Sequence, residues 1–214
     1  MRRQTRRAAQ SRSVSVCAGM TRRKAIRKAS KKLTEAEARF GRAVTPRDGT
    51  IHEKVITRTG KMGDQPELRT ISALVIAGGL IGANRRLVRA GVRMMLAHEI
   101  ATLAKDLIKR RIDRTRPHTA TSHSERKVRF GRRTAKKHTS FPSGHSAGAI
   151  AVARAFACDY PEYQAAALAT AAVVAGAQVP RLTHYPTDVA GGIVLGAASA
   201  AAANWIVGPE AAAS

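Results

Sequence analysis

Acidic residues and cysteines are scarce in this chain of 214 residues. Only 14 Asp and Glu stand against 38 Lys and Arg, which gives a formal net charge of +24. An excess of this size favours anionic partners, which are nucleic acid, anionic lipid or a phosphorylated substrate. The two cysteines, Cys17 and Cys158, lie in regions of different character, so nothing indicates a disulfide framework or a cysteine-based metal site.

Three further features are missing. No G-x-x-x-x-G-K-[ST] sequence occurs, which argues against a P-loop nucleotide site. The basic N-terminal stretch has no apolar core of the kind that a secretory signal needs, so we expect no cleavable signal. Alternating β-branched runs and hairpin turns are almost absent. The sequence therefore predicts an all-α fold, a helical bundle.

The positive charge is concentrated in two places. Residues 1–32 contain twelve Lys and Arg and no Asp or Glu, and a second basic cluster covers residues 109–137. We expect residues 1–66 to form a basic, largely disordered arm, with one helix over Leu33–Phe40. Residues 67–209 would then form the helical domain, and residues 210–214 a short tail.

Apolar stretches and helix breakers predict where the helices of this domain lie. An uncharged stretch covers Ile71–Ala83, and helical spacing of apolar residues predicts a long helix over Leu87–Ile112 that ends before Pro117. A polar, basic loop follows at His118–Ser140. Three more helices are predicted in the apolar second half of the chain: Ser143–Cys158, Gln164–Pro180 and Pro186–Gly208.

The last of these helices is long enough to cross a membrane. Val189–Gly208 has the length of about 20 apolar residues that a spanning helix needs, and Trp205 suits an interface anchor. Leu87–Leu107, in contrast, carries several charges that are costly in lipid. A soluble bundle with buried alanine-rich helices is the alternative, but we favour a multi-pass membrane bundle.

Residues 142–145, Pro-Ser-Gly-His, lie where a loop becomes a helix. Ser143 is a natural N-cap, and Gly144 lets a ligand approach the backbone closely. The free N–H groups of the first helical turn form a cradle for an anion, which His145 can reach. Taken alone, however, this stretch is more often a plain capped helix with an exposed histidine.

The stretch His184-Tyr-Pro-Thr-Asp188 has a similar character. Pro186 suits the first turn of a helix, which places His184 just before the helix and Asp188 within it. A carboxylate there can accept a hydrogen bond from one imidazole nitrogen, which leaves the other as a nucleophile or base. A His–Asp pair that merely caps the helix is the equally good alternative.

Lys109 and Arg116 end the long helix. They are seven residues apart, which is two helical turns, so both could reach one phosphate from the same face. In so basic a chain, ordinary surface charge is a strong alternative. Together with the two histidine stretches, however, they provide the parts for phosphoryl transfer through a phosphohistidine, and no Cys/His or carboxylate spacing indicates a metal site.

The type-2 phosphatidic acid phosphatase superfamily has the signature K-x6-RP, PSGH and then (S)R-x5-H-x3-D. This sequence resembles it, in order and spacing, at Lys109, Arg116-Pro117, Pro142–His145, His184 and Asp188. This superfamily includes membrane lipid phosphatases, soluble bacterial acid phosphatases and vanadium haloperoxidases. The resemblance covers roughly Gln65–Gly208 and leaves the basic arm unexplained. It implies a metal-independent phosphatase that needs no cofactor.

The resemblance also implies a role for each motif residue. His184 would attack phosphorus and Asp188 would orient it, while His145 would protonate the leaving oxygen and then activate water. Four further groups would hold the phosphoryl oxygens: Lys109, Arg116, Ser143 and the backbone N–H of Gly144.

One position departs from the family pattern. The arginine expected six residues before the histidine is Gln178, which can donate a hydrogen bond but has no charge. Arg181, three residues before His184, either supplies the missing charge or faces lipid head groups. Loss of a phosphate-binding group costs ~10²–10³ in rate, so a degenerate member that binds phosphate without turnover is a further alternative.

We therefore expect a membrane phosphatase that hydrolyses a lipid phosphomonoester or pyrophosphate. The alternative enzyme is a soluble or peripheral acid phosphatase, whereas a haloperoxidase is disfavoured because those chains are much larger as a rule. A nucleic-acid-binding protein is disfavoured because the arm lacks interleaved aromatic residues. We expect the arm to bind an anionic membrane surface instead.

The same reasoning predicts an orientation in the cell membrane. Two candidate segments precede Lys109, so a cytoplasmic arm would place the active site on the cytoplasmic face as well. The basic loop 118–140 agrees with this orientation through the positive-inside rule. The sequence predicts no oligomeric state.

Overall fold

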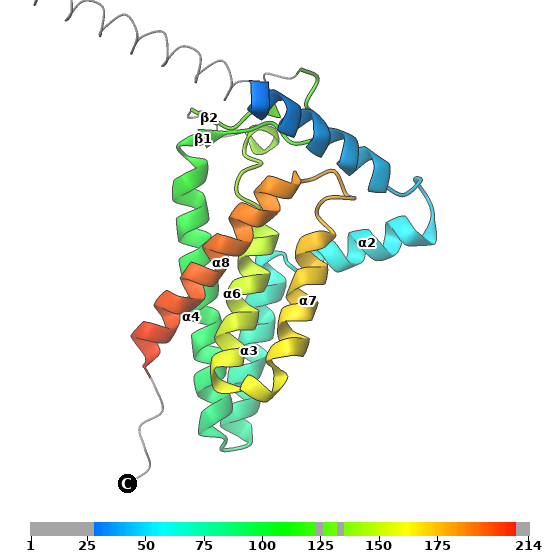
Figure 1. Ribbon diagram of the computed structural model, residues 1–214. Coiled ribbons are helices and arrows are strands. Elements are labelled where there is room, and N and C mark those ends of the chain that lie inside the picture. Colours follow the sequence, from blue (N-terminus) through cyan, green and yellow to red (C-terminus); the bar gives the residue numbers. More distant parts are fainter. Residues whose placement is uncertain (1–27, 123–125, 132–134, 209–214) are drawn as a thin grey trace, which may run out of the picture.

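The computed structural model describes residues 28–122, 126–131 and 135–208. Five of the described helices pack side by side in a bundle (Figure 1): α3 (Gln65–Ile81), α4 (Arg85–Lys109), α6 (Gly144–Asp159), α7 (Gln164–Gly176) and α8 (Pro186–Val207). The described strands, β1 (Ile112–Asp113) and β2 (Arg129–Phe130), form one short antiparallel pair. The expected all-α class is therefore confirmed.

Helix α6 is the centre of the bundle, in contact with α4, α7 and α8. Its buried side chains are mainly alanines, and the main core cluster combines Ala147, Ala151 and Ala155 with Ala200 and Ala203 of α8. Side chains this small let helix backbones approach closely. The predicted helix, Ser143–Cys158, differs from the observed α6 by one residue at each end.

Two glycines of α8 are required by this close approach. A Cβ atom on Gly192 would lie 2.5 Å from the carbonyl oxygen of Ser143, and one on Gly196 would collide with the carbonyl oxygen of Ala147. The backbone N–H of Ser143 also donates to the carbonyl oxygen of Asp188 over 3.0 Å. The N-terminal ends of α6 and α8 are therefore held directly against each other.

Helix α7 ends four residues earlier than predicted. We expected a helix over Gln164–Pro180, but its last residue is Gly176. The carbonyl oxygen of Gln178 accepts hydrogen bonds from the backbone N–H groups of Thr183 and His184 instead of continuing the helical pattern. The chain thereby turns toward His184.

Helix α8 is the described helix that is long and apolar enough to cross a membrane. A third of its apolar stretch is buried, and Val194, Trp205 and Ile206 are exposed. The other described helices do not meet this length and hydropathy together. Length and composition thus mark one candidate span within the described residues.

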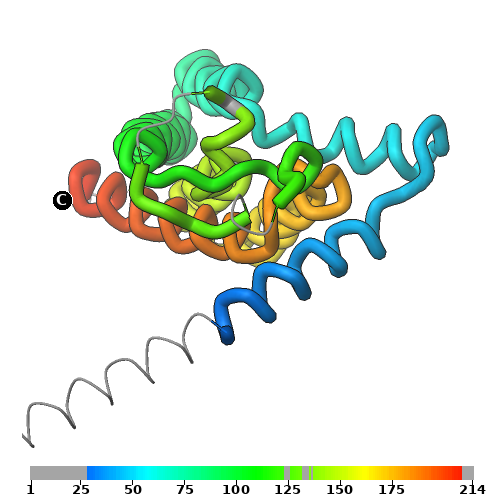
Figure 2. The backbone as a smooth tube through the Cα atoms, turned by 90° about the horizontal axis from the view of Figure 1, so that it is seen from above, coloured from blue at the N-terminus to red at the C-terminus, as the bar shows by residue number. Residues whose placement is uncertain are grey.

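The structure differs from the expected arm between residues 28 and 61. Residues 28–44 form a helix, which includes the predicted Leu33–Phe40, and α2 (Ile51–Lys61) forms another. Both lie beside the end of the bundle where α6 and α8 begin, as the views in Figures 1 and 2 show. The basic composition of this segment gave no sign of its buried contacts, which include the Glu37–Arg114 ion pair. Residues 1–27 and the predicted tail 210–214 lie outside the described residues.

Substitution of Gly196 tests the contact between α6 and α8. We expect Gly196→Ala to lower the free energy of unfolding in detergent by about 1–3 kcal/mol, because the new methyl group must displace the α6 backbone. Gly78→Ala in α3 is the matched control, because its Cβ would enter open space. The control should be neutral or stabilising by up to about 1 kcal/mol. Equal melting temperatures for the two variants would contradict the close approach.

Candidate active site

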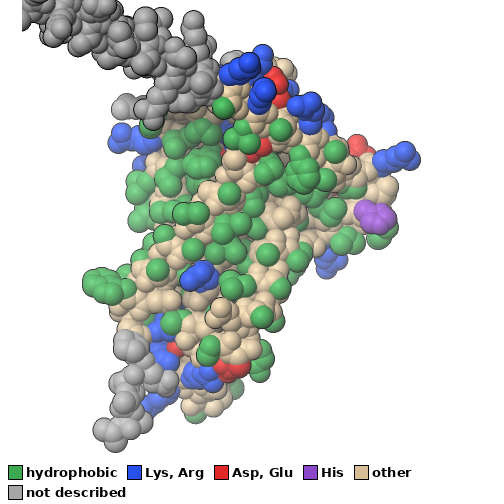
Figure 3. Space-filling model, in the orientation of Figure 1, with side chains coloured by type: hydrophobic (Ala, Val, Ile, Leu, Met, Phe, Trp, Pro, Cys, Tyr) green, Lys and Arg blue, Asp and Glu red, His purple; other side chains and the backbone are tan. Residues whose placement is uncertain are grey.

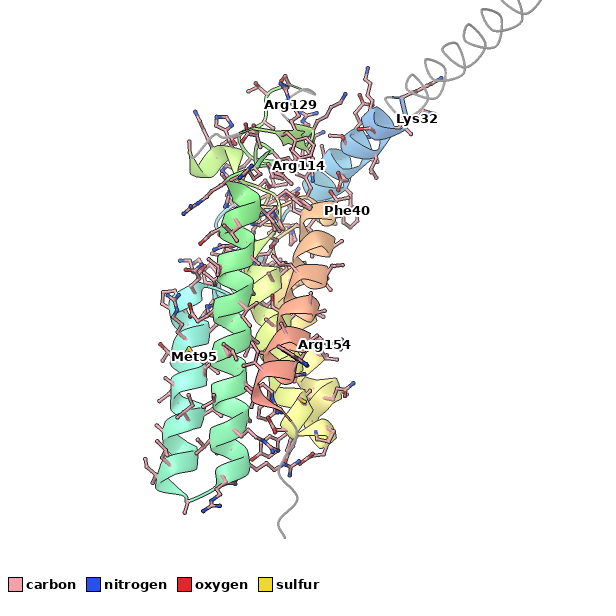
Figure 4. All side chains as sticks on the ribbon, turned by 90° about the vertical axis from the view of Figure 1, so that its left-hand side faces the viewer. Lys32, Phe40, Met95, Arg114, Arg129 and Arg154 are labelled. Carbon is pink, nitrogen blue, oxygen red and sulfur yellow. The ribbon has the colours of Figure 1, made fainter. Side chains whose placement is uncertain are left out.

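The motif residues from distant parts of the chain meet at one end of the bundle. Lys109 ends α4, His145 lies in the first turn of α6, and Asp188 lies in the first turn of α8. The rings of His145 and His184 approach edge to face, with their centroids 6.2 Å apart. Figure 4 shows Arg114 at this same end, above the start of α8.

His184 and Asp188 are linked through a serine that the sequence did not indicate. His184 Nδ1 lies 3.7 Å from Asp188 Oδ2, which is too long for a direct hydrogen bond. Ser140 Oγ donates to Asp188 Oδ2 over 2.6 Å and lies 3.4 Å from His184 Nδ1. His184, Asp188 and Ser140 are all buried. This side of the imidazole is therefore occupied, which leaves Nε2 as the nitrogen available for reaction.

Asp188 accepts two further hydrogen bonds. The backbone N–H of Tyr185 donates to Oδ2 over 2.9 Å, and Arg114 Nη1 donates to Oδ1 over 2.6 Å. Both Arg114 and Asp188 are almost completely buried. Ser140 and Arg114 were missed because, among many serines and arginines, neither carries a distinguishing sequence signal. The carboxylate is fully satisfied, so its position is fixed.

His145 has a carboxylate partner of its own. Its Nε2 lies 2.6 Å from Oδ1 of Asp64, the residue that precedes α3. Asp64 was not singled out in the sequence, because it lies 81 residues before His145 in a stretch that was expected to be a disordered arm. The site thus contains two His–carboxylate pairs.

Burial keeps both imidazoles neutral near pH 7. It lowers the pKa of His145 to about 4, although the nearby carboxylate of Asp64 acts in the opposite direction. Burial also lowers the pKa of His184, and the positive charges of Arg116 and Lys109 lower it further, while Asp188 opposes them. Lys109 and Arg116 are therefore close enough to act electrostatically on His184.

Ser143 and Gly144 have the geometry expected of a helix start. Ser143 Oγ accepts from the backbone N–H of Ser146 over 3.4 Å and lies 2.8 Å from Ser146 Oγ. A Cβ atom on Gly144 would lie 2.9 Å from Cδ of Lys105, so a side chain here would crowd this lysine. The first turn of α6 therefore presents free backbone N–H groups next to His145.

Gln178 lies next to the site, but its side chain has no N–H group left to bind a ligand. Its amide nitrogen donates to the carbonyl oxygens of Gly60 and Val174, each over 3.1 Å, which uses both amide hydrogens. Its amide oxygen accepts from Arg181 Nη1 over 3.2 Å and from Thr183 Oγ1 over 3.1 Å. The side chain therefore positions Arg181.

Arg181 lies among the charged groups of the site. Its positive charge contributes to the lowered pKa of Arg116 and to that of His145, while Asp64 acts on Arg181 with the opposite sign. Its side chain is half-buried and packs against Gly60 at the end of α2. Three cationic side chains thus surround the two histidines: Lys109, Arg116 and Arg181.

The arrangement suits an anion with several oxygens. Cationic side chains and the N-terminal end of α6 can bind such oxygens, while His184 Nε2 and His145 provide a nucleophile and a proton carrier. Within the described ranges, no group of three or more His, Cys, Asp and Glu side chains could hold a metal ion. These features are those required for phosphoryl transfer to a histidine.

Comparison with known proteins reveals a relative of part of this chain. A lipid A 1-phosphatase from Rhizobium johnstonii is 37% identical over 98 residues, which are 44% of this chain and 38% of that protein. The matched part is therefore well under half of the length of this relative.

Comparison with solved structures reveals a similar fold. The crystal structure of a transmembrane PAP2-type phosphatidylglycerolphosphate phosphatase from Bacillus subtilis matches with a TM-score of 0.59 at 21% identity. The match covers 85% of this chain and 86% of the other. The family model of the PAP2 superfamily matches residues 86–211, more than half of the chain. The chain therefore belongs to the PAP2 superfamily.

Proposed function

We propose that this protein is a membrane phosphatase that hydrolyses a lipid phosphomonoester or pyrophosphate through a phosphohistidine on His184. The observation that carries the proposal is the buried His184, which is held by Ser140 and Asp188 on one side and lies 6.2 Å, ring to ring, from His145. The two relatives named above are phosphatases whose names refer to lipids, which supports a lipid substrate.

The reaction takes place in two steps. In the first, the substrate monoanion passes its proton to the neutral His145, Nε2 of His184 attacks phosphorus, the bond from phosphorus to the leaving oxygen breaks, and His145 gives that oxygen the proton. In the second, His145 takes a proton from water, the resulting hydroxide attacks phosphorus, and the phosphorus–nitrogen bond breaks to release phosphate. No step needs a metal or a cofactor.

The cationic groups act on the phosphoryl oxygens. Lys109, Arg116 and Arg181 bind the charge that these oxygens carry in the transition state, together with the N–H of Gly144 and the hydroxyl of Ser143. In this scheme Gln178 does not touch phosphate. Its amide oxygen holds Arg181, which takes the place of the missing family arginine from a position three residues further along the chain.

We infer that the active site faces the cytoplasm. The helix of residues 28–44, which follows the basic N-terminal stretch, lies at the same end of the bundle as the site (Figure 1). The positive-inside rule places the basic arm in the cytoplasm, and the active site would then lie on the cytoplasmic side as well. The basic cluster at 109–137 lies on the same side. The helices of the bundle would cross the membrane together with α8.

Removal of the nucleophile should abolish turnover. We expect His184→Ala to lower the rate of phosphate release from a lipid phosphate by at least about 10³-fold, because no other group can form the phosphoryl intermediate. His52→Ala, which changes an exposed histidine of α2, is the matched control. Wild-type activity should withstand EDTA and be inhibited by vanadate. Equal rates for His184→Ala and the control would refute the phosphohistidine.

Neutralisation of Arg181 should weaken catalysis without unfolding the protein. We expect Arg181→Gln to lower kcat/KM by about 10²–10³-fold, because one charge on the transition state is lost. Arg154→Gln is the matched control, since Arg154 lies well down the bundle on α6 (Figure 4). Should the two variants retain the same kcat/KM, Arg181 would not be the substitute for the missing arginine.

The rate should fall as the pH rises through the range in which phosphate monoesters lose their second proton. Burial lowers the pKa of His145 to about 4, so this histidine is neutral at pH 7. The proton that His145 gives to the leaving oxygen must therefore come from the singly charged form of the substrate. We expect kcat/KM to fall about tenfold per pH unit above pH ~6, near the second pKa of a phosphate monoester. A kcat/KM that stays constant between pH 6 and 9 would show that His145 does not act as an acid with a proton brought by the substrate.

A further inference from the structure

The helix of residues 28–44 reaches the catalytic carboxylate through one buried side chain. Glu37 is only 6% exposed, although the helix that carries it also has five exposed Lys and Arg residues. Its Oε2 accepts a hydrogen bond from Arg114 Nη2 over 2.8 Å, and its Oε1 accepts one from the backbone N–H of Thr187, also over 2.8 Å. Glu37 thus contacts both the arginine that binds Asp188 and the first turn of α8.

Arg114 is held at every nitrogen of its guanidinium group. Nη1 donates to Asp188 Oδ1 and to Thr187 Oγ1, Nη2 donates to Glu37, and Nε donates to the carbonyl oxygen of Arg126 over 2.8 Å. Its plane also lies 3.9 Å over the ring of Tyr185. Since a guanidinium is rigid and planar, fixing Nη2 fixes the direction of Nη1 toward Asp188. The carboxylate of Glu37 therefore takes part in setting the position of Asp188.

The outer surface of the same helix has two distinct faces. Leu33 and Phe40 are each 54% exposed and Val44 is 39% exposed; at spacings of seven and four residues they share one side. Five exposed basic residues follow the other side: Lys28, Lys31, Lys32, Arg39 and Arg42. In Figure 3, Lys and Arg side chains lie at this end of the molecule and again at the opposite end of the bundle, with mainly hydrophobic side chains between the two.

The position of the helix identifies what covers these faces. Glu37 is bonded to Thr187 in the first turn of α8, which is the candidate membrane span. A helix bonded to the first turn of a span lies at the level where the bilayer meets water. An apolar stripe beside a basic row is the pattern of a helix that lies in the surface of an anionic bilayer.

We propose that helix 28–44 is an interfacial clamp: it binds the anionic membrane surface and, through Glu37 and Arg114, holds Asp188 in the position that His184 requires. This inference rests on the proposed phosphatase function and adds a partner and a positioning residue to it. Glu37 touches neither substrate nor His184, so it acts on the rate only through Arg114 and Asp188.

The first test separates positioning from substrate binding. In proteoliposomes of phosphatidylcholine with phosphatidylglycerol, and with the water-soluble p-nitrophenyl phosphate as substrate, we expect Glu37→Gln to lower kcat by about 10- to 100-fold. KM should change less than about twofold, because Glu37 does not contact the phosphate. Glu35→Gln is the matched control, since Glu35 is on the same helix, has a side chain that is 40% exposed, and is paired only loosely with Lys31 at 3.9 Å. A kcat equal to that of Glu35→Gln would overturn the clamp.

The second test addresses the membrane surface and does not need activity. Hydrogen–deuterium exchange of residues 28–44 in the full chain should be slower in vesicles that contain phosphatidylglycerol than in phosphatidylcholine alone. Phe40→Ser should lose this protection, while Phe130→Ser, which changes another exposed phenylalanine at the same end, should keep it. Identical exchange of wild type in the two kinds of vesicle would overturn the surface contact.

The two readouts also distinguish this inference from the proposed function. A wild-type protein that releases no phosphate from any substrate, yet shows lipid-dependent exchange at residues 28–44, would contradict the phosphatase and retain the surface helix. In Glu37→Gln, exchange of residues 28–44 should become faster because the buried ion pair that docks the helix is gone. Unchanged exchange in this variant would overturn the link to Arg114 even if the enzyme were active.

Discussion

The buried ion pair between Arg114 and Asp188 is the interaction on which the rest of the site depends. A carboxylate with no access to water is costly unless its oxygens are paired, and breaking such a pair leaves an uncompensated charge worth about 3–5 kcal/mol. Here Arg114, Ser140 and the backbone of Tyr185 satisfy Asp188, and Ser140 lies between this carboxylate and His184. The network that offsets the cost of burying this charge also orients His184, the proposed nucleophile.

Electrostatics at this end of the bundle is a balance rather than a simple excess of positive charge. Lys109, Arg116 and Arg181 surround two imidazoles that burial keeps neutral, and the carboxylates of Asp64 and Asp188 each face one of them. A phosphate anion would therefore enter a site in which three cations lie near two neutral imidazoles. The net charge of +24 indicates only that a partner is anionic, whereas the placement of Asp64 and Asp188 beside the two imidazoles is visible only in the fold.

Sequence patterns predicted the helices well where apolar periodicity is strong, as in α4 and α6. The motifs also predicted that Lys109, His145 and His184 belong to one site. Partners that lie far apart in the chain carried no signal. Asp64 and Glu37 are separated from His145 and Arg114 by 81 and 77 residues, and both lie in a stretch whose basic composition is typical of disorder. Gln178 was expected to donate toward phosphate, but only the fold reveals that both of its amide hydrogens are used by backbone carbonyls.

The glycine contacts between α6 and α8 have a mechanical consequence. Ser143 is hydrogen-bonded to the backbone of Asp188, and Gly192 and Gly196 leave no gap against α6, so the helix starts beside the acid and the nucleophile form one rigid frame. Asp64 before α3 and Glu37 of the 28–44 helix lie outside this frame and contact it through side-chain hydrogen bonds to His145, Arg114 and Thr187. A change at either of these contacts can therefore tilt a single side chain, while the spacing between the two helix starts stays the same.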